Sequence, residues 1–143
     1  MITLASEKWL KIGDVATKSG LPVKTIRYYE ELGLLVPVVQ RTQSGYRLFR
    51  EQVFNRLAFI KRAQSLGLNL TEIEETLAIH DAGELPCGMV KQRLVNKKEE
   101  IAQQIEALEI LQSELQGILS GWQEKPPAEL VARTICPNIQ PQE

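Results

Sequence analysis

Two cysteines are the side chains of this sequence best suited to bind an external chemical signal. Cys87 lies just before a long segment with helical periodicity, and Cys136 lies in a Cys-Pro-x-Ile stretch near the C-terminus. A helix N-terminus favours the thiolate, which is the form that binds metals and attacks disulfides. Two thiolates suit the linear coordination of a soft ion such as Hg(II), whereas zinc prefers four ligands. The same pair could instead form a reversible disulfide between subunits.

Other chemistry has less support in the sequence. His80 is the single histidine and precedes Cys87 by seven positions, so it is a candidate nitrogen ligand, although a lone histidine is more often a surface or packing residue. Both thiols being inert also stays open. An iron–sulfur cluster is not expected, because such clusters use four cysteines. The sequence has no glycine-rich phosphate loop and no nucleophile motif, so it does not indicate an enzyme.

A second group of side chains is basic and aromatic and could bind double-stranded DNA. An arginine can reach either a phosphate or the edge of a guanine. Arg27 is the best candidate for a base edge. The residues expected to contact DNA are Thr25, Arg27, Tyr28, Arg41, Tyr46 and Arg47, with Lys18 and Arg62 on the phosphate backbone.

Two short helices and a hairpin would position these side chains. Apolar residues at 12, 15 and 16 predict one face of a first helix, and a second helix follows Gly20-Leu21-Pro22 and stops at Gly33. Such a pair is a helix-turn-helix, whose second helix enters the major groove. Residues 34–39 are too β-branched and proline-broken for a helix, and residues 41–49 predict a small hairpin, or wing, with Ser44-Gly45 at its tip.

The rest of the first half predicts a second helical pair. Residues 51–66 carry Val53, Leu57 and Ile60 at helical spacing, with Arg56, Lys61 and Arg62 on other faces. Thr71, followed three residues later by Glu74, predicts a capping box at the start of the next helix. Residues 81–86 then interrupt the helical pattern.

A long helix is predicted from about residue 88 to 121. Its apolar stripe recurs every seven residues over about four heptads, which is typical of a coiled coil. A helix of about 30 residues is ~45 Å long and cannot bury this stripe against so small a domain, so a homodimer is expected. A helix folded back on its own chain is the alternative. The residues expected at the dimer seam are Leu94, Ile101, Ile105, Leu108, Leu111, Leu115 and Ile118.

The order and spacing of these motifs resemble the MerR family of transcription regulators. The resemblance rests on residues 12–16, 25–30, 33–35 and 45–47, and it continues through residues 59–63 and 66–68 into the long helix. It implies a mainly α fold, with a winged helix-turn-helix DNA-binding domain over residues 1–82. A dimerisation helix over 83–122 would pack antiparallel with its partner as a coiled coil, and residues 123–143 would form an effector-binding loop.

The resemblance also implies a mechanism. A homodimer would bind a palindromic operator inside an over-long promoter spacer. An effector would then make the dimer bend and untwist that DNA, which realigns the promoter elements that RNA polymerase contacts. In an antiparallel pair, Cys87 would meet Cys136 of the partner subunit, as in metal-responsive members, so a soft divalent ion of the Hg, Cd, Zn or Pb type is implied. One departure is that Ser120-Gly121-Trp122 stands where divalent-type members carry another cysteine. Copper(I)-type members have a serine at the position of Cys87.

Charge and hydropathy agree with a DNA-binding first half. The formal net charge is −1 over 143 residues, but residues 1–66 hold 11 Lys/Arg against 5 Asp/Glu and residues 67–143 hold 6 against 13. Phosphate binding favours a basic half, and an acidic half would point away from DNA. No apolar run approaches the ~20 residues of a membrane span, and the N-terminus lacks a signal pattern, so a cytoplasmic protein is expected. An architectural DNA-binding protein without an effector remains an alternative.

Overall fold

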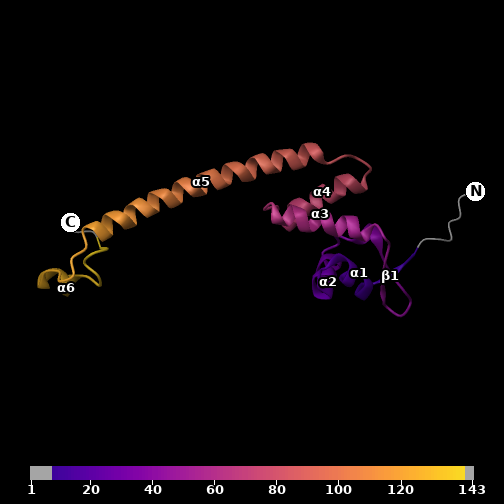
Figure 1. Cartoon of the computed structure of the whole chain (residues 1–143), viewed down its shortest axis with the longest axis horizontal. Helices are drawn as coiled ribbons and strands as arrows, with labels where there is room; N and C mark the ends of the chain where they lie inside the picture. Colours follow the sequence, from indigo (N-terminus) through magenta and orange to yellow (C-terminus); the bar gives the residue numbers. More distant parts are fainter. Residues whose placement is uncertain (1–7, 141–143) are drawn as a thin grey trace, which may run out of the picture. The chain divides into compact units, whose positions relative to one another are not determined.

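The structure is a computed structural model that describes residues 8–140 (Figure 1). It is mainly helical, with one small sheet, as the sequence predicts. The chain divides into two compact units, Met1–Lys97 and Lys98–Glu143, and α5 runs from the first into the second. In order, the elements are β1 Leu10–Lys11, α1 Ile12–Ser19, α2 Val23–Glu31, the 3-10 helix η2 Val36–Val38, β2 Val39–Arg41, β3 Arg47–Phe49, α3 Val53–Ser65, α4 Leu70–Asp81, α5 Cys87–Ser120 and α6 Ala128–Arg133.

Helices α1 and α2 form the predicted helix-turn-helix. The turn between them begins at Gly20, whose φ of 76° lies in the left-handed region that glycine adopts without steric cost. The backbone N–H of Gly20 donates to the carbonyl of Ala16, which closes α1. Val15 of α1 and Ile26 of α2 are fully buried, so the two helices share one core.

A three-stranded antiparallel sheet in the order β1-β3-β2 forms the wing and its support. The hairpin predicted at residues 41–49 is confirmed, with Gly45 in the left-handed conformation in the loop between β2 and β3. Leu10 pairs with Phe49, and both side chains are buried. The segment after α2, predicted to be non-helical, contains one short turn of 3-10 helix with Pro37 in its first turn.

The structure contradicts the predicted position of Arg56 on an outer face of α3. The sequence pattern placed it with Lys61 and Arg62 on faces away from the core, but Arg56 is buried. Its guanidinium donates to Asp81 Oδ1 at 2.6 Å and Oδ2 at 2.9 Å, and its Nε donates to the Leu34 carbonyl. The apolar spacing could not reveal this, because the carboxylate that pairs with Arg56 lies 25 residues further along the chain.

The cap of α4 also differs from the sequence prediction. Asn69, not Thr71, is the N-cap: its Oδ1 accepts from the Glu72 N–H at 2.8 Å, and Glu72 Oε1 accepts from the Asn69 N–H at 3.0 Å. Both patterns have the same spacing of three residues. The Asn69 box satisfies the first free N–H groups of a helix that starts two residues earlier than a Thr71 cap would allow.

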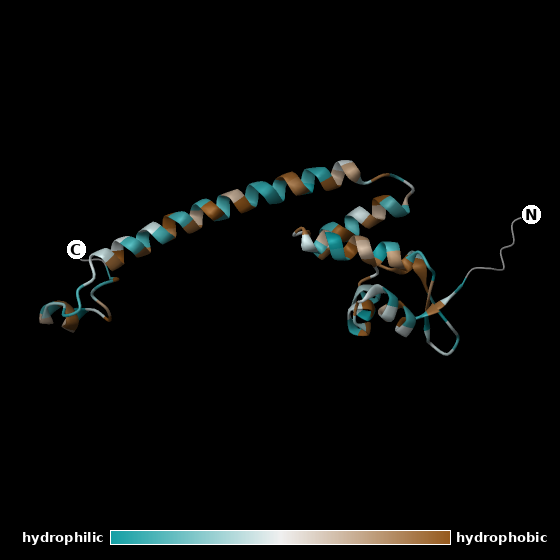
Figure 2. Cartoon of the chain, in the orientation of Figure 1, coloured by the Kyte–Doolittle hydropathy of each residue, from teal (hydrophilic) through white to brown (hydrophobic). Residues whose placement is uncertain are grey.

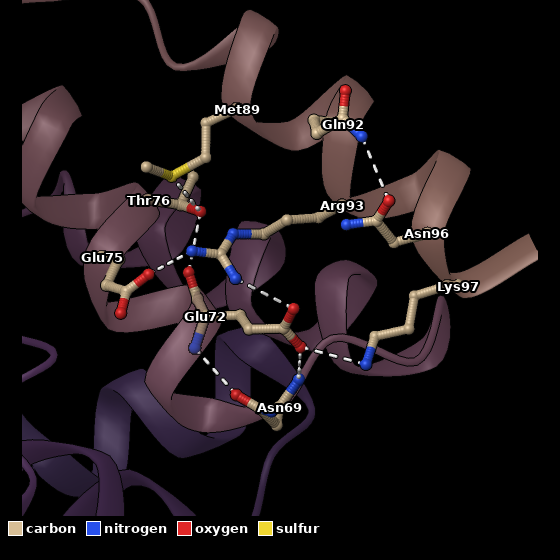
Figure 3. Close-up of polar contacts among 9 residues, drawn as sticks. All are labelled: Asn69, Glu72, Glu75, Thr76, Met89, Gln92, Arg93, Asn96 and Lys97. Atoms are coloured by element: carbon tan, nitrogen blue, oxygen red, sulfur yellow. Dashed lines mark hydrogen bonds and ion pairs between the residues drawn. The ribbon is translucent and has the colours of Figure 1, made fainter. Parts of the chain in front are cut away.

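The first turns of α5 are fixed to α4 by ion pairs (Figure 3). Arg93 pairs with Glu72 at 3.0 Å and also with Glu75, and Lys97 pairs with Glu72 at 3.2 Å. The pKa of Glu72 lies below its usual value, mainly because its carboxylate accepts the Asn69 backbone N–H and further because Arg93 and Lys97 bond to it. This network lies within the first unit and joins Arg93 and Lys97 of α5 to the start of α4.

Helix α5 starts at Cys87 itself and has 34 residues. Figure 2 shows hydrophobic and hydrophilic segments alternating along it. Leu94, in the first unit, packs partly against that unit's own core. Further along α5, the predicted seam residues from Ile101 to Leu115 are 48–64% exposed. A long apolar stripe is therefore present on α5 and open to solvent in the single chain.

After α5, the described part of the second unit contains the short helix α6 and a segment to residue 140. Asn138 bonds twice to the backbone of Gln123, with Oδ1 accepting from its N–H at 2.9 Å and Nδ2 donating to its carbonyl at 3.0 Å. Gln140 Oε1 accepts from the backbone N–H groups of Ile135 and Cys136. The tail around Cys136 is thus held by its own side chains close to residue 123, just past the end of α5. Within the described residues, no helix is long and apolar enough to cross a membrane.

Candidate nucleic-acid interface and thiol positions

The exposed face of α2 carries two of the residues predicted to contact DNA, Arg27 and Tyr28. Ile26 and Tyr29 anchor the helix in the core, which leaves Arg27 exposed and Tyr28 half-exposed. Tyr29 donates its hydroxyl to Gln64 Oε1 at 2.5 Å, and burial, together with the neighbouring Tyr28, raises the pKa of Tyr29 above its usual value. Tyr29 therefore stays a neutral donor that fixes α2 to α3. The sequence analysis did not assign Tyr29 to the core, although it lies three residues after Ile26.

A hollow of about 800 Å³ lies between the start of α1, helix α2 and the wing. Arg27, Tyr46 and Arg47 line it together, so the structure brings three predicted DNA contacts from two separate elements to one place. Lys11, which the sequence analysis did not single out, lines the same hollow. Tyr46 is 72% exposed at the wing loop. A concave surface with cations and an exposed aromatic ring suits a nucleic-acid backbone and its sugars.

The two predicted wing arginines have an intramolecular partner that the sequence analysis missed. Arg41 Nη2 lies 3.4 Å from Glu30 Oε1, and Arg47 Nε lies 3.3 Å from Glu30 Oε2. Arg41 also donates Nη1 to the Gly45 carbonyl at 3.3 Å, which supports the wing loop. The wing is therefore tied to the end of the recognition helix through one carboxylate.

The predicted backbone contacts Lys18 and Arg62 line a second hollow, of about 740 Å³, between α1 and α3. Lys61 lines it as well, so three cations gather there. Arg62 Nη1 lies 3.4 Å from Ser65 Oγ, and Ser65 lines the same hollow. The sequence analysis did not predict Lys61 as a backbone contact, although Lys61 is the immediate neighbour of Arg62, which it did predict.

The two cysteines occupy different units and are both free thiols. Cys87 is exposed at the first position of α5, and Cys136 is half-buried with its N–H bonded to Gln140. His80 lies on α4 and lines a small hollow with Phe59 and Thr76. Across the residues that the structure describes, no group of three or more His, Cys, Asp or Glu side chains could hold a metal ion within one chain.

Comparison with known proteins identifies the family. Residues 10–78 match the family described as MerR HTH family regulatory protein, and residues 54–118 match MerR, DNA binding. The chain is 41% identical over 108 residues to the mercuric resistance operon regulatory protein of Bacillus cereus, which covers 76% of this chain and 81% of that protein. The chain belongs to the MerR family of DNA-binding transcription regulators. The resemblance in its motifs is thereby confirmed.

Two further MerR proteins show the range of relatives. The HTH-type transcriptional regulator CueR of Escherichia coli is 37% identical over 112 residues, covering 78% of this chain and 82% of CueR. The crystal structure of the transcription regulator PbrR691 from Ralstonia metallidurans, in complex with lead(II), matches with a TM-score of 0.71 at 30% identity. That match covers 84% of this chain and 93% of PbrR691. These relatives are transcription regulators.

Proposed function

We propose that this MerR-family regulator binds a palindromic operator as a homodimer and activates transcription by distorting the DNA in response to a thiol-binding effector. The observation that carries the DNA part is the hollow shared by Arg27, Tyr46 and Arg47. It joins the recognition helix and the wing into one surface. Thr25, Tyr28 and Arg41 extend that surface, and Lys18 with Arg62 would hold the flanking phosphates, which position a protein on DNA without reading its sequence.

The homodimer is proposed because the stripe on α5 is exposed. Side chains from Ile101 to Leu115 present apolar area at the spacing of a coiled coil, and burying it against a second α5 would remove that area from water. Ile118 extends the stripe, and Leu94 would border it while packing on its own domain. In this scheme residues 1–82 bind DNA, residues 83–122 dimerise as an antiparallel coiled coil, and residues 123–143 form the effector loop.

A two-fold dimer also explains the proposed operator. Two recognition helices related by a two-fold axis bind two half-sites in opposite orientation, so the operator is an inverted repeat. If the dimer activates transcription by distorting the DNA, RNA polymerase at the promoter would be its protein partner. This would take place in the cytoplasm. The effector would act by favouring the bent form of the DNA, whose cost depends on its sequence.

The effector is proposed to be a soft metal ion held by Cys87 and by Cys136 of the partner subunit. The donor set fits such an ion, because thiolates are soft ligands and both thiols are free. Two thiolates suit a linear ion such as Hg(II) better than zinc, which takes four ligands. A mercuric resistance regulator and the lead-bound PbrR691 among the relatives support this class of effector. His80 would be an additional nitrogen ligand only if its replacement weakens metal binding.

Metal stoichiometry on the reduced, full-length protein tests the effector. Hg(II), Cd(II), Zn(II), Pb(II) and Cu(I) would each be titrated against the wild type, Cys87→Ser and Cys136→Ser, with Ser120→Ala as a matched control. We expect one of the ions to bind tightly, binding to be lost in either cysteine variant, and the control to behave as wild type. Binding that survives both cysteine replacements would reject the thiolate site.

A wild type that binds none of the ions would favour the second candidate, a disulfide between Cys87 and Cys136 of the partner subunit, formed by an oxidant. Exposure of Cys87 is the observation that favours this candidate. If DNA distortion does not change with either metal or oxidant, the architectural protein without an effector is the better description. Neither of these outcomes would affect the DNA-binding part of the proposal.

A further inference from the structure

Two arginines of the wing face each other directly across the hairpin. Arg41 of β2 and Arg47 of β3 are cross-strand partners in the antiparallel register. Like charges at such positions destabilise a strand pair. Glu30, from the end of α2, offsets both: Oε1 lies 3.4 Å from Arg41 Nη2, and Oε2 lies 3.3 Å from Arg47 Nε.

The three side chains differ in how much water reaches them. Glu30 is 11% exposed and Arg47 is 18% exposed, so the pair between them is shielded from salt. Arg41 is 50% exposed, and an ion pair at such a position contributes little to stability. The ion pair of Glu30 with Arg47 is shielded from water, although the buried Arg47 Nε forms no hydrogen bond within it. The contact of Glu30 with Arg41 is a hydrogen bond, but it is exposed and can exchange for another anion.

We propose that Glu30 is a specificity-determining residue, which keeps the charge of the wing arginines away from the phosphates of random DNA. The proposal rests on the proposed DNA-binding function. Binding to random DNA derives from phosphate contacts, and two wing arginines that share one carboxylate carry a net charge of +1 instead of +2, so they add less to it. On operator DNA, base contacts from α2 hold the duplex against the wing, so Arg41 can exchange Glu30 for a phosphate.

The contacts of Glu30 with Arg41 and Arg47 also fix the angle between the recognition helix α2 and the wing. Glu30 belongs to α2, and both arginines belong to the hairpin. The carboxylate therefore joins α2 to the wing, and both of these elements line the hollow, α2 through Arg27. An operator whose base edges and phosphates match this fixed angle can contact the recognition helix and the wing at the same time. Random DNA does not gain that match.

Replacing Glu30 tests the proposal. In Glu30→Gln, the arginines lose their counter-charge, so we expect affinity for a random-sequence duplex to rise about threefold or more, and its dependence on log salt to steepen by about 0.9 per new phosphate contact. Affinity for a duplex selected from a random library by the wild-type protein should change less. The ratio of the two affinities therefore falls.

Two further variants of the full-length protein serve as controls. Glu31→Gln removes the same charge from the next residue of α2, which is exposed, and should leave the ratio of affinities unchanged. Arg41→Gln in the Glu30→Gln background should cancel most of the gain on random DNA, because residues in one ion-pair network have non-additive effects. Circular dichroism and unfolding curves would show that each variant is folded.

The outcomes separate this inference from the function on which it rests. A lower ratio in Glu30→Gln alone, with coupling to Arg41, supports it. Equal ratios in Glu30→Gln and Glu31→Gln, or additive effects of Glu30 and Arg41, would overturn it. If the wild-type protein enriches no DNA sequence at all, the proposed sequence-specific function fails instead.

Discussion

The ion pair between the buried Arg56 and the partly exposed Asp81 makes a strong prediction about how the DNA-binding unit is held together. The Arg56 side chain is 7% exposed and that of Asp81 is 33% exposed. Asp81→Asn keeps the shape of the side chain and removes its charge, so a buried guanidinium loses its counter-ion. Removing one partner of a fully buried pair costs about 3–5 kcal/mol, and because water reaches Asp81 we expect a loss of about 2 kcal/mol in the free energy of unfolding.

Urea unfolding of the full-length protein would measure this loss, with Glu84→Gln, at an exposed position of the connector that follows α4, as the matched control. The Arg56 guanidinium holds the pKa of Asp81 below its usual value, against the opposing effect of burial. The stabilisation is therefore complete above the unfolded pKa of about 3.9 and is lost as the pH falls through the lower folded pKa. The difference between wild type and Asp81→Asn should be constant near neutral pH and shrink in acid.

A loss at neutral pH no greater than that of Glu84→Gln would refute the reasoning, and so would a difference that grows on acidification. Either result would mean that Arg56 finds enough compensation in the Leu34 carbonyl alone. The pair would then not be needed to join the end of α4 to the segment that follows the recognition helix.

Three further predictions concern the recognition helix, the α4 cap and the dimer. Arg27→Ala should weaken binding to selected DNA by about 1–3 kcal/mol and binding to random DNA by less, measured by fluorescence anisotropy; equal losses would assign Arg27 to a phosphate. Asn69→Ala should lower the free energy of unfolding by about 1 kcal/mol in urea, whereas Thr71→Ala should leave it nearly unchanged, and the reverse order would restore the cap predicted from the sequence. Leu108→Glu should convert a dimer to monomer in sedimentation equilibrium because it buries a charge in the apolar seam, while Ser113→Glu, on the opposite side of α5, should stay dimeric; a dimer in both would rule out this seam.

Local signals in the sequence were sufficient to predict the helix-turn-helix and the wing. Gly20 and Gly45 both adopt positive φ, at the turns where the sequence predicted the chain to reverse. The apolar spacing of residues 12, 15 and 16 likewise predicts a buried face, on which Val15 is fully buried. Such features depend only on residues that are neighbours in the sequence, so the local pattern of residue types is enough to predict them.

Features that depend on distant partners were not predictable in this way. Arg56 is buried only because Asp81, 25 residues away, accepts both ends of its guanidinium. Glu30 meets the wing arginines only once the strand register is fixed, since the register decides that Arg41 and Arg47 are opposite each other. A sequence pattern shows that a charged residue lies off the apolar face, but not which charge it will meet.

Selection of DNA from a random duplex library by the reduced, full-length protein tests the central claim most directly. We expect the enriched sequence to be an inverted repeat, with half-sites separated by a whole number of helical turns, about 10–10.5 base pairs each, because two recognition helices related by a two-fold axis must reach the same face of the duplex. Enrichment of a single unrepeated half-site, or of no sequence, would contradict a dimeric, sequence-specific regulator.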